Sequence, residues 1–172
     1  VIQAVDDYQD LLRLSVASAG NDHRLGANEA PPAVVSMFLG DELNAILDSI
    51  ENDTCYNGTE SAPLKLGVHV LPKLPRDTTD RNRTSPFAFT GNKFEFRMLG
   101  SSASIATANI MLNTTVAESL RIYADELEGA ADFPTALHDL IRRVIREHKR
   151  IIFNGNGYDD AWIAEAERRG LL

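Results

Sequence analysis

The sequence contains almost no cysteine and no long apolar run, and both absences restrict what the chain can be. Its 172 residues include a single cysteine, Cys55, which excludes an intrachain disulfide. A free thiol is typical of a reducing compartment, so we expect a cytoplasmic protein. No stretch of apolar residues approaches the roughly 20 that a membrane-spanning helix needs, and we therefore expect no membrane association.

The chain also lacks an excess of basic residues. It has 17 Lys and Arg against 25 Asp and Glu, which gives a formal net charge of -8. Proteins that bind nucleic acid usually carry a basic excess, so we expect no nucleic-acid partner. A local basic cleft for a phosphorylated substrate is still compatible with this composition, because a cleft can oppose the global sign.

The two ends of the chain are unusual for a complete protein. The chain begins without methionine, inside a helical pattern, and it stops shortly after another helical pattern. Its length is sufficient for one domain with a hydrophobic core. We therefore expect residues 1–172 to form a single domain that is a piece of a longer protein, truncated at both ends.

The hydrophobic periodicity predicts an α+β fold, in which antiparallel strands pack with several α-helices. A hairpin near residues 86–98 is expected, with its turn at Thr90-Gly91-Asn92. Asp132 is a candidate N-cap. Residues 51–63 are typical of a loop, and residues 154–157 of a turn that ends a helix. Further helices are expected at 5–20, 41–50, 105–128, 132–148 and 160–169, and further strands at 33–39 and 66–71.

The second arm of the hairpin carries the most informative pattern. Because side chains alternate along a strand, Lys93, Glu95 and Arg97 share one face. Phe94 and Phe96 share the other face, which belongs in a core. A carboxylate between two cations has its charged form favoured, so Glu95 is suited to a metal ion and the cations to anionic groups. The same alternation is common on solvent-facing strands, where it forms only ion pairs.

Two polar loops offer further candidates. The run Arg81-Asn82-Arg83-Thr84 places two guanidinium groups one residue apart, where they can bind phosphate or carboxylate oxygens. They can equally form a solvated basic loop. Residues 21–32 concentrate polar groups between two buried elements, which is where binding sites are often carried. His23 in this loop is either a metal ligand, a base or an exposed loop residue.

Taken together and in this order, these motifs resemble the C-terminal half of the catalytic domain of glutamine synthetases, specifically of the type III branch. The resemblance extends over essentially the whole chain, and three strings carry it: NDHRLGANEAPP, DTTDRNRTSPFAFTGNKFEFRMLGSS and IIFNGNGY. The resemblance implies an ATP-dependent ligation of glutamate and ammonia through γ-glutamyl phosphate. It also implies ATP and Mg²⁺ (or Mn²⁺) as cofactors, and a homo-oligomer whose active sites are shared between subunits.

The resemblance implies roles for three loop residues. Arg24 would bind the glutamate substrate. Glu29 would help to remove a proton from ammonium, on a loop that closes over the site. Arg83 would contact phosphate, both in catalysis and in nucleotide binding. The loop between Arg24 and Glu29 is one residue shorter than is common in the family, so the role of Glu29 depends on aligning the Glu-Ala-Pro end.

Three strand residues also take roles by resemblance. Lys93 would contact nucleotide, Glu95 would ligate a divalent metal, and Arg97 would hold the substrate carboxylate. Two positions depart from the family pattern. Lys93 stands where an arginine is usual, and Ala88 stands where a further arginine is usual.

The same motifs leave two other functions open. One is a ligase that joins glutamate to an amine other than ammonia, and the other is a non-catalytic assembly or interaction domain. In the family, the other metal ligands come from upstream sequence, and another part of the site comes from a neighbouring subunit. We therefore expect the isolated chain neither to make glutamine nor to bind a full set of metals.

Overall fold

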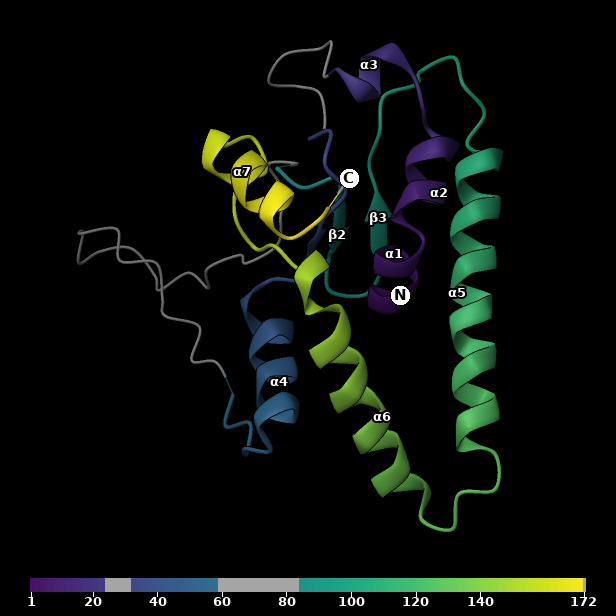
Figure 1. Ribbon diagram of the computed structural model, residues 1–172, viewed down its shortest axis with the longest axis vertical. Helices are drawn as coiled ribbons and strands as arrows, with labels where there is room; N and C mark the ends of the chain where they lie inside the picture. Colours follow the sequence, from purple (N-terminus) through teal and green to yellow (C-terminus); the bar gives the residue numbers. More distant parts are fainter. Residues whose placement is uncertain (24–31, 59–83, 172) are drawn as a thin grey trace, which may run out of the picture.

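The computed structural model describes residues 1–23, 32–58 and 84–171, and it places a small three-stranded sheet among seven α-helices (Figure 1). The predicted α+β class is confirmed. The strands are β1 (Met37–Phe38), β2 (Phe87–Phe89) and β3 (Phe94–Phe96). The helices are α1 (Ile2–Asp7), α2 (Gln9–Ser15), α3 (Ala19–Asp22), α4 (Asp41–Asn52), α5 (Ala106–Leu127), α6 (Phe133–His148) and α7 (Asp160–Arg168), with a 3-10 turn η2 (Lys149–Ile151) after α6.

The predicted hairpin is confirmed as the antiparallel pair β2–β3. Phe87 pairs with Phe96, and the Thr90 N–H closes the turn by donating to the Lys93 carbonyl at 2.9 Å. Gly91 in the turn has φ of 92°, a conformation that a residue without Cβ adopts at little cost. The turn therefore sets the register of the strand that carries Glu95.

The sheet differs from the prediction in one pairing. β1 runs parallel to β2, with Met37 opposite Phe87, whereas we expected antiparallel strands throughout. A long connection that includes α4 separates the two strands, and such a connection allows the parallel direction that a tight turn forbids. The strand predicted at 33–39 is also shorter, and the strand predicted at 66–71 lies outside the described residues.

The first predicted helix is interrupted. Tyr8 leaves the helical conformation (φ -120°, ψ 29°) and separates α1 from α2. The helix predicted at 5–20 also ends early, because α2 stops at Ser15 and Gly20 lies inside the separate helix α3. The break changes the direction of the chain, so that α1 packs against α5, α6 and η2 while α2 continues along α5.

The remaining helices follow the predicted ranges closely. The carboxylate of Asp132 caps α6 as expected, accepting hydrogen bonds from the Thr135 N–H at 3.4 Å and hydroxyl at 2.6 Å. The predicted loop at 51–63 begins slightly later, since α4 extends to Asn52. None of the helices in the described part of the chain has the length and apolarity that crossing a bilayer requires.

One hydrophobic core joins the sheet to both ends of the chain. Phe153 stacks on Trp162 of α7 with ring centroids 3.7 Å apart. The buried core residues come from α1, α2, the sheet and the residues beside β1, η2, and α7 with the segment after it: Val5, Leu12, Val35, Met37, Leu39, Phe87, Ile151, Trp162, Ala166 and Leu171. Burial of these side chains therefore fixes the position of the β2–β3 hairpin relative to the helices.

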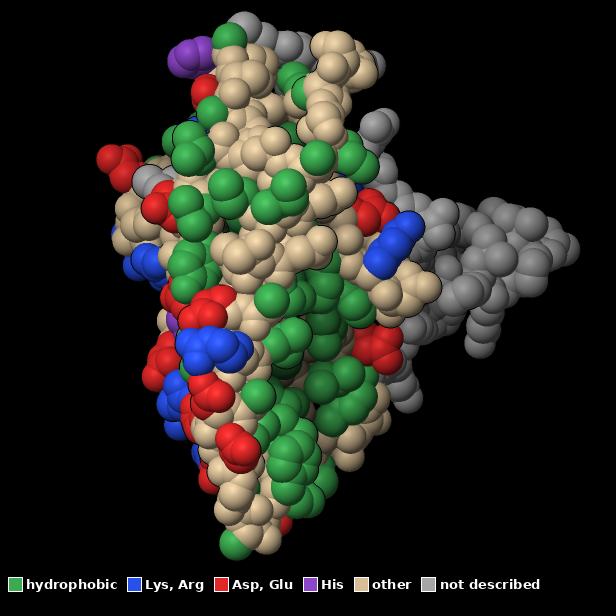
Figure 2. All heavy atoms as spheres, turned by 90° about the vertical axis from the view of Figure 1, so that its right-hand side faces the viewer, with side chains coloured by type: hydrophobic (Ala, Val, Ile, Leu, Met, Phe, Trp, Pro, Cys, Tyr) green, Lys and Arg blue, Asp and Glu red, His purple; other side chains and the backbone are tan. Residues whose placement is uncertain are grey.

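Apolar side chains also gather on the surface between α5 and α6. Figure 2, which views the molecule from the α5 side, shows them beside a band of charged side chains. They line an open hollow of about 270 Å³. Its apolar and aromatic walls come from α1, α4, β3, α5 and α6: Val1, Ile2, Leu47, Phe94, Tyr123, Leu137, Leu140, Ile141, Val144 and Ile145.

Candidate functional site

The aromatic face of β3 orients the candidate site. Phe94 and Phe96 both contact the fully buried Phe87, with ring centroids 5.8 and 5.6 Å apart. These contacts place one face of β3 against the core, as predicted. The alternate side chains must then point away from the core.

The opposite face of β3 brings three charged side chains together. Lys93 Nζ lies 3.3 Å from Glu95 Oε1, and Arg97 Nη2 lies 3.0 Å from Glu95 Oε2. Arg97 Nε also donates to Glu95 Oε2, at 3.2 Å. Each carboxylate oxygen therefore has its own cation, and the three residues form a plus, minus, plus array on a paired strand.

The two cations differ in how firmly they are held. The side chain of Arg97 is 13% exposed, that of Glu95 33% and that of Lys93 65%. Arg97 is thus fixed beside Glu95, whereas Lys93 extends into solvent. An exposed lysine can move to a ligand at little cost, because its ion pair contributes little to stability.

The cations also set the ionisation of Glu95. Hydrogen bonds from Arg97, and secondarily from Lys93, hold the pKa of this carboxyl below its ordinary value. Glu95 is therefore ionised at neutral pH, as a metal ligand must be. Mg²⁺ takes about six oxygen ligands, so one carboxylate supplies only part of a metal site. The donor chemistry of Glu95 fits such an ion, with the remaining ligands supplied from elsewhere.

The three predicted loop residues, Arg24, Glu29 and Arg83, lie outside the described residues. The structure does describe the positions that flank them. His23 is exposed at the C-terminal end of α3, Pro32 is buried, and Thr84 immediately precedes the buried Ser85 and β2.

Helix α3, which precedes residues 24–31, is tied to the segment that follows the charged strand β3. Asn21 Oδ1 accepts a hydrogen bond from the Leu99 N–H at 2.7 Å, and Asn21 Nδ2 donates to the Leu99 carbonyl at 3.1 Å. The same amide nitrogen donates to the Val16 carbonyl at 2.8 Å. Sequence reasoning missed this residue, although Asn21 opens the first of the strings that carry the resemblance.

The turn at residues 154–157 contacts the residues that follow the two predicted polar loops: Pro32, which follows residues 24–31, and Thr84, which follows residues 81–83. The Gly157 N–H donates to the Thr84 carbonyl at 2.9 Å. A Cβ on Gly157 would lie 2.5 Å from that oxygen and 2.7 Å from Cγ of Pro32. Pro32 follows the segment that contains Glu29, and Thr84 follows the segment that contains Arg83. Gly157 therefore holds the exits of both segments at one point.

The interpretation of this turn as the end of a helix is wrong. α6 ends at His148, and η2 intervenes before the turn begins. Asn154 Oδ1 instead accepts hydrogen bonds from the Leu39 N–H at 2.8 Å and the Gly40 N–H at 3.1 Å, which anchors the turn beside β1. The string IIFNGNGY was the available signal, because its conspicuous Asn and Gly residues serve these long-range contacts.

Comparison with known proteins identifies relatives along the whole chain. Residues 136–172 match the model of the glutamine synthetase C-terminal domain. The chain is 51% identical over 174 residues to the type-3 glutamine synthetase of Dictyostelium discoideum. It is 47% identical over 178 residues to a glutamine synthetase of Bacteroides fragilis, and 45% over 180 residues to one of Butyrivibrio fibrisolvens. Each alignment covers 99% of this chain but 24% of the relative, so the chain spans about a quarter of the length of these relatives.

Proposed function

We propose that this chain provides part of the active site of an ATP-dependent glutamate–ammonia ligase. The chain belongs to the glutamine synthetase family, and the predicted resemblance to the type III branch is confirmed. The observation that carries the proposal is the charged face of β3. It holds one ionised carboxylate between two cations, on a strand whose other face is locked into the core. Such an array suits a reaction in which a divalent cation and phosphate groups meet a carboxylate substrate.

In this proposal each residue of the strand has a separate role. Glu95 ligates Mg²⁺ or Mn²⁺, and the ion supplies charge neutralisation for the transferred phosphoryl group. Arg97, which is nearly buried, holds the carboxylate of glutamate in a fixed position. Lys93 reaches from its exposed position to the phosphates of ATP as a single point charge.

The loop residues complete the part of the site that this chain provides. Arg24 binds glutamate, Arg83 stabilises the transferred phosphate, and Glu29 accepts a proton from ammonium before the amine attacks γ-glutamyl phosphate. The bonds between Asn21 and Leu99 support this grouping, because they join the helix that precedes Arg24 to the segment that follows the strand carrying Glu95. For Arg83, the grouping is supported by its neighbour Thr84, which lies close in sequence to the start of β2.

In this proposal, the rest of the full-length protein provides the active-site groups that this chain lacks. We place the full-length enzyme in the cytoplasm as a homo-oligomer whose subunits share active sites. The apolar hollow between α5 and α6 supports packing against further polypeptide, since open apolar surfaces often mark interaction sites. The isolated chain is inactive in this proposal, and γ-glutamyl transfer by the purified chain would contradict that part.

The variant Glu95→Ala in the full-length protein tests the proposal. We expect glutamine synthesis to fall on the order of 100-fold or more, because removing one electrostatic group from such a site has an effect of this size. The thermal midpoint should change little, since Glu95 lies on the outward face of its strand. The matched control is Glu118→Ala, which removes a partly exposed carboxylate that is ion-paired with Arg121 on α5. Turnover near that of the control would remove Glu95 from the site.

A further inference from the structure

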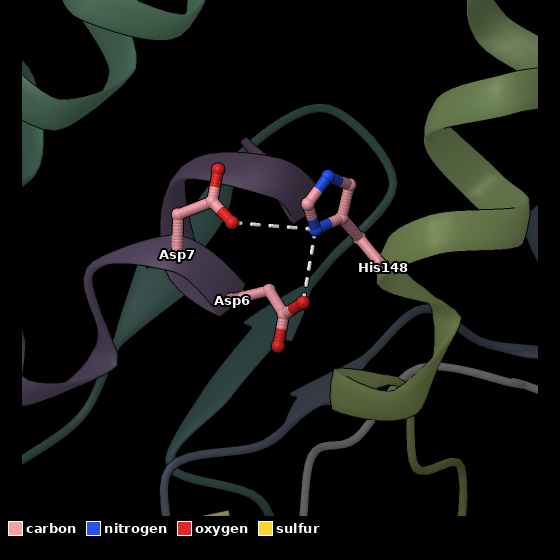
Figure 3. Close-up of side chains that lie close together, drawn as sticks. All are labelled: Asp6, Asp7 and His148. Carbon is pink, nitrogen blue, oxygen red and sulfur yellow. Dashed lines mark hydrogen bonds and ion pairs between the residues drawn. The ribbon is translucent and has the colours of Figure 1, made fainter.

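Two aspartates of α1 and a histidine at the end of α6 converge beside the core (Figure 3). His148 Nδ1 lies 2.9 Å from Asp6 Oδ2 and 3.6 Å from Asp7 Oδ1. Asp6 and His148 are buried, at 4% and 9% exposure, whereas Asp7 is exposed. The cluster is therefore closed on the side of the core and open to solvent on the side of Asp7.

We propose that Asp6, Asp7 and His148 bind a divalent transition-metal ion, with Zn²⁺ as the best match. One ligand atom from each residue lies within 4.8 Å of the other two. Zn²⁺ forms bonds of about 2.0–2.2 Å in tetrahedral sites, which places neighbouring ligand atoms roughly 3.3 Å apart. The separations of 2.9 and 3.6 Å from His148 Nδ1 bracket that spacing. A water molecule at the open side would complete the four ligands.

The type of donor also points to this class of ion. One imidazole and two carboxylates suit zinc and its first-row neighbours better than Mg²⁺ or Ca²⁺, which prefer oxygen alone. The exposed Asp7 can change its rotamer to close the remaining distance, and it gives an ion a path into the cluster. Without a metal, His148 Nδ1 makes a hydrogen bond with Asp6 instead.

The groups around the cluster orient its ligands. Arg150 Nε donates to Asp6 Oδ1 at 2.8 Å, which leaves Oδ2 directed at His148. Glu147 Oε2 lies 3.9 Å from His148 Nε2, where it can attract the ring N–H when Nδ1 binds a metal. Outer carboxylate and cation partners of this kind hold metal ligands in place. The two negative charges of Asp6 and Asp7 outweigh the one positive charge of Arg150, so the local field still favours a divalent cation.

A metal at this position would join α1 to the C-terminal end of α6, two segments that are distant in sequence. The site is independent of the proposed function, because it shares no residue with the charged face of β3. Binding to the folded state alone would raise the stability of the protein.

Zinc binding by the full-length protein tests this inference. Equilibrium dialysis against Zn²⁺ would compare the wild type with Asp7→Asn and His148→Gln. We expect each variant to lose one zinc per subunit, or to bind it at least 10-fold more weakly, and Zn²⁺ to raise the thermal midpoint of the wild type more than theirs. The control His138→Gln removes a half-buried histidine of the same helix that lies outside the cluster, and it should leave zinc binding unchanged.

Asp7→Asn separates metal binding from a purely structural role. Asp7 is exposed and lies beyond hydrogen-bond distance of His148, so this variant should fold normally. Equal zinc content and affinity in the wild type and in Asp7→Asn would overturn the proposal. A loss of stability in His148→Gln with zinc binding unchanged would equally overturn it, because the cluster would then be only an ion pair between two helices.

Discussion

Asn21 and Leu99, which are 78 residues apart in sequence, are joined by two hydrogen bonds. The side-chain amide of Asn21 bonds to both the N–H and the carbonyl of Leu99. Asn21 lies in α3, just before the segment that contains Arg24 and Glu29. Leu99 lies two residues after Arg97, in the segment that follows β3, the strand that carries Glu95. This contact connects two of the three motifs that carry the family resemblance, and it makes the geometry of the site depend on a residue with no chemical role.

Asn21→Ala should destabilise the segment that follows β3. Asn21 is buried, and its loss would leave the N–H and carbonyl of Leu99 without their partner, at a cost of about 1–3 kcal/mol for each unsatisfied group. Hydrogen exchange of the Leu99 amide should become faster, and activity of the full-length enzyme should fall with it. Asn52→Ala is the control, because Asn52 is exposed and its side chain donates to the Asp48 carbonyl one turn earlier in the same helix. Unchanged protection of the Leu99 amide would contradict this role.

Gly157→Ala should displace the exits of both loop segments. The new Cβ would lie 2.5 Å from the Thr84 carbonyl oxygen, a backbone atom that cannot move aside alone. Overpacking of this kind costs about 1–3 kcal/mol, which thermal unfolding would detect as a lower midpoint. In Gly20→Ala, by contrast, the nearest atom is Leu99 Cδ1 at 3.4 Å, so that variant should unfold like the wild type. Equal midpoints for the two variants would show that the contact at Gly157 is not restrictive.

Arg97→Gln should raise the pKa of Glu95. Arg97 makes the largest contribution to holding this pKa below its ordinary value, and Lys93 the next. Because the folded-state pKa is the lower one, the pairing stabilises the fold above the unfolded-state pKa. That stabilisation is lost as the pH falls through the folded-state pKa. Substitution of Arg97 should therefore move the titration of Glu95 to higher pH.

Carbon-13 NMR of the labelled Glu95 carboxyl would measure this shift directly. Lys149→Gln is a suitable control, since Lys149 Nζ forms its ion pair with Glu51 Oε1, at 2.6 Å, rather than with Glu95. A Glu95 carboxyl that already titrates at its ordinary value in the wild type would refute the ion-pair geometry of the strand.

Much of this architecture was predictable because it depends on neighbours in sequence. The alternation along Lys93 to Arg97 assigned the charged and aromatic faces, and the structure places them so. The cap at Asp132 and the long helices followed from local spacing and side-chain chemistry. The roles of Arg24, Glu29 and Arg83 stay predictions, because they rest on the resemblance and lie outside the described residues.

The features that sequence reasoning missed involve residues that are far apart. The parallel pairing of Met37 with Phe87, the bond from Gly157 to Thr84 and the convergence of Asp6 with His148 each join distant segments. The break at Tyr8 has the same origin, since its benefit is the packing of α1 against three other elements.

The sequence by itself determined the family, the helices, the hairpin and the face of the strand that carries charge, because periodicity and motif order are local properties of the chain. The tertiary structure alone decided which loops end beside that strand and which polar side chains meet across the core. Those contacts arise from packing between segments that the chain brings together only when it folds.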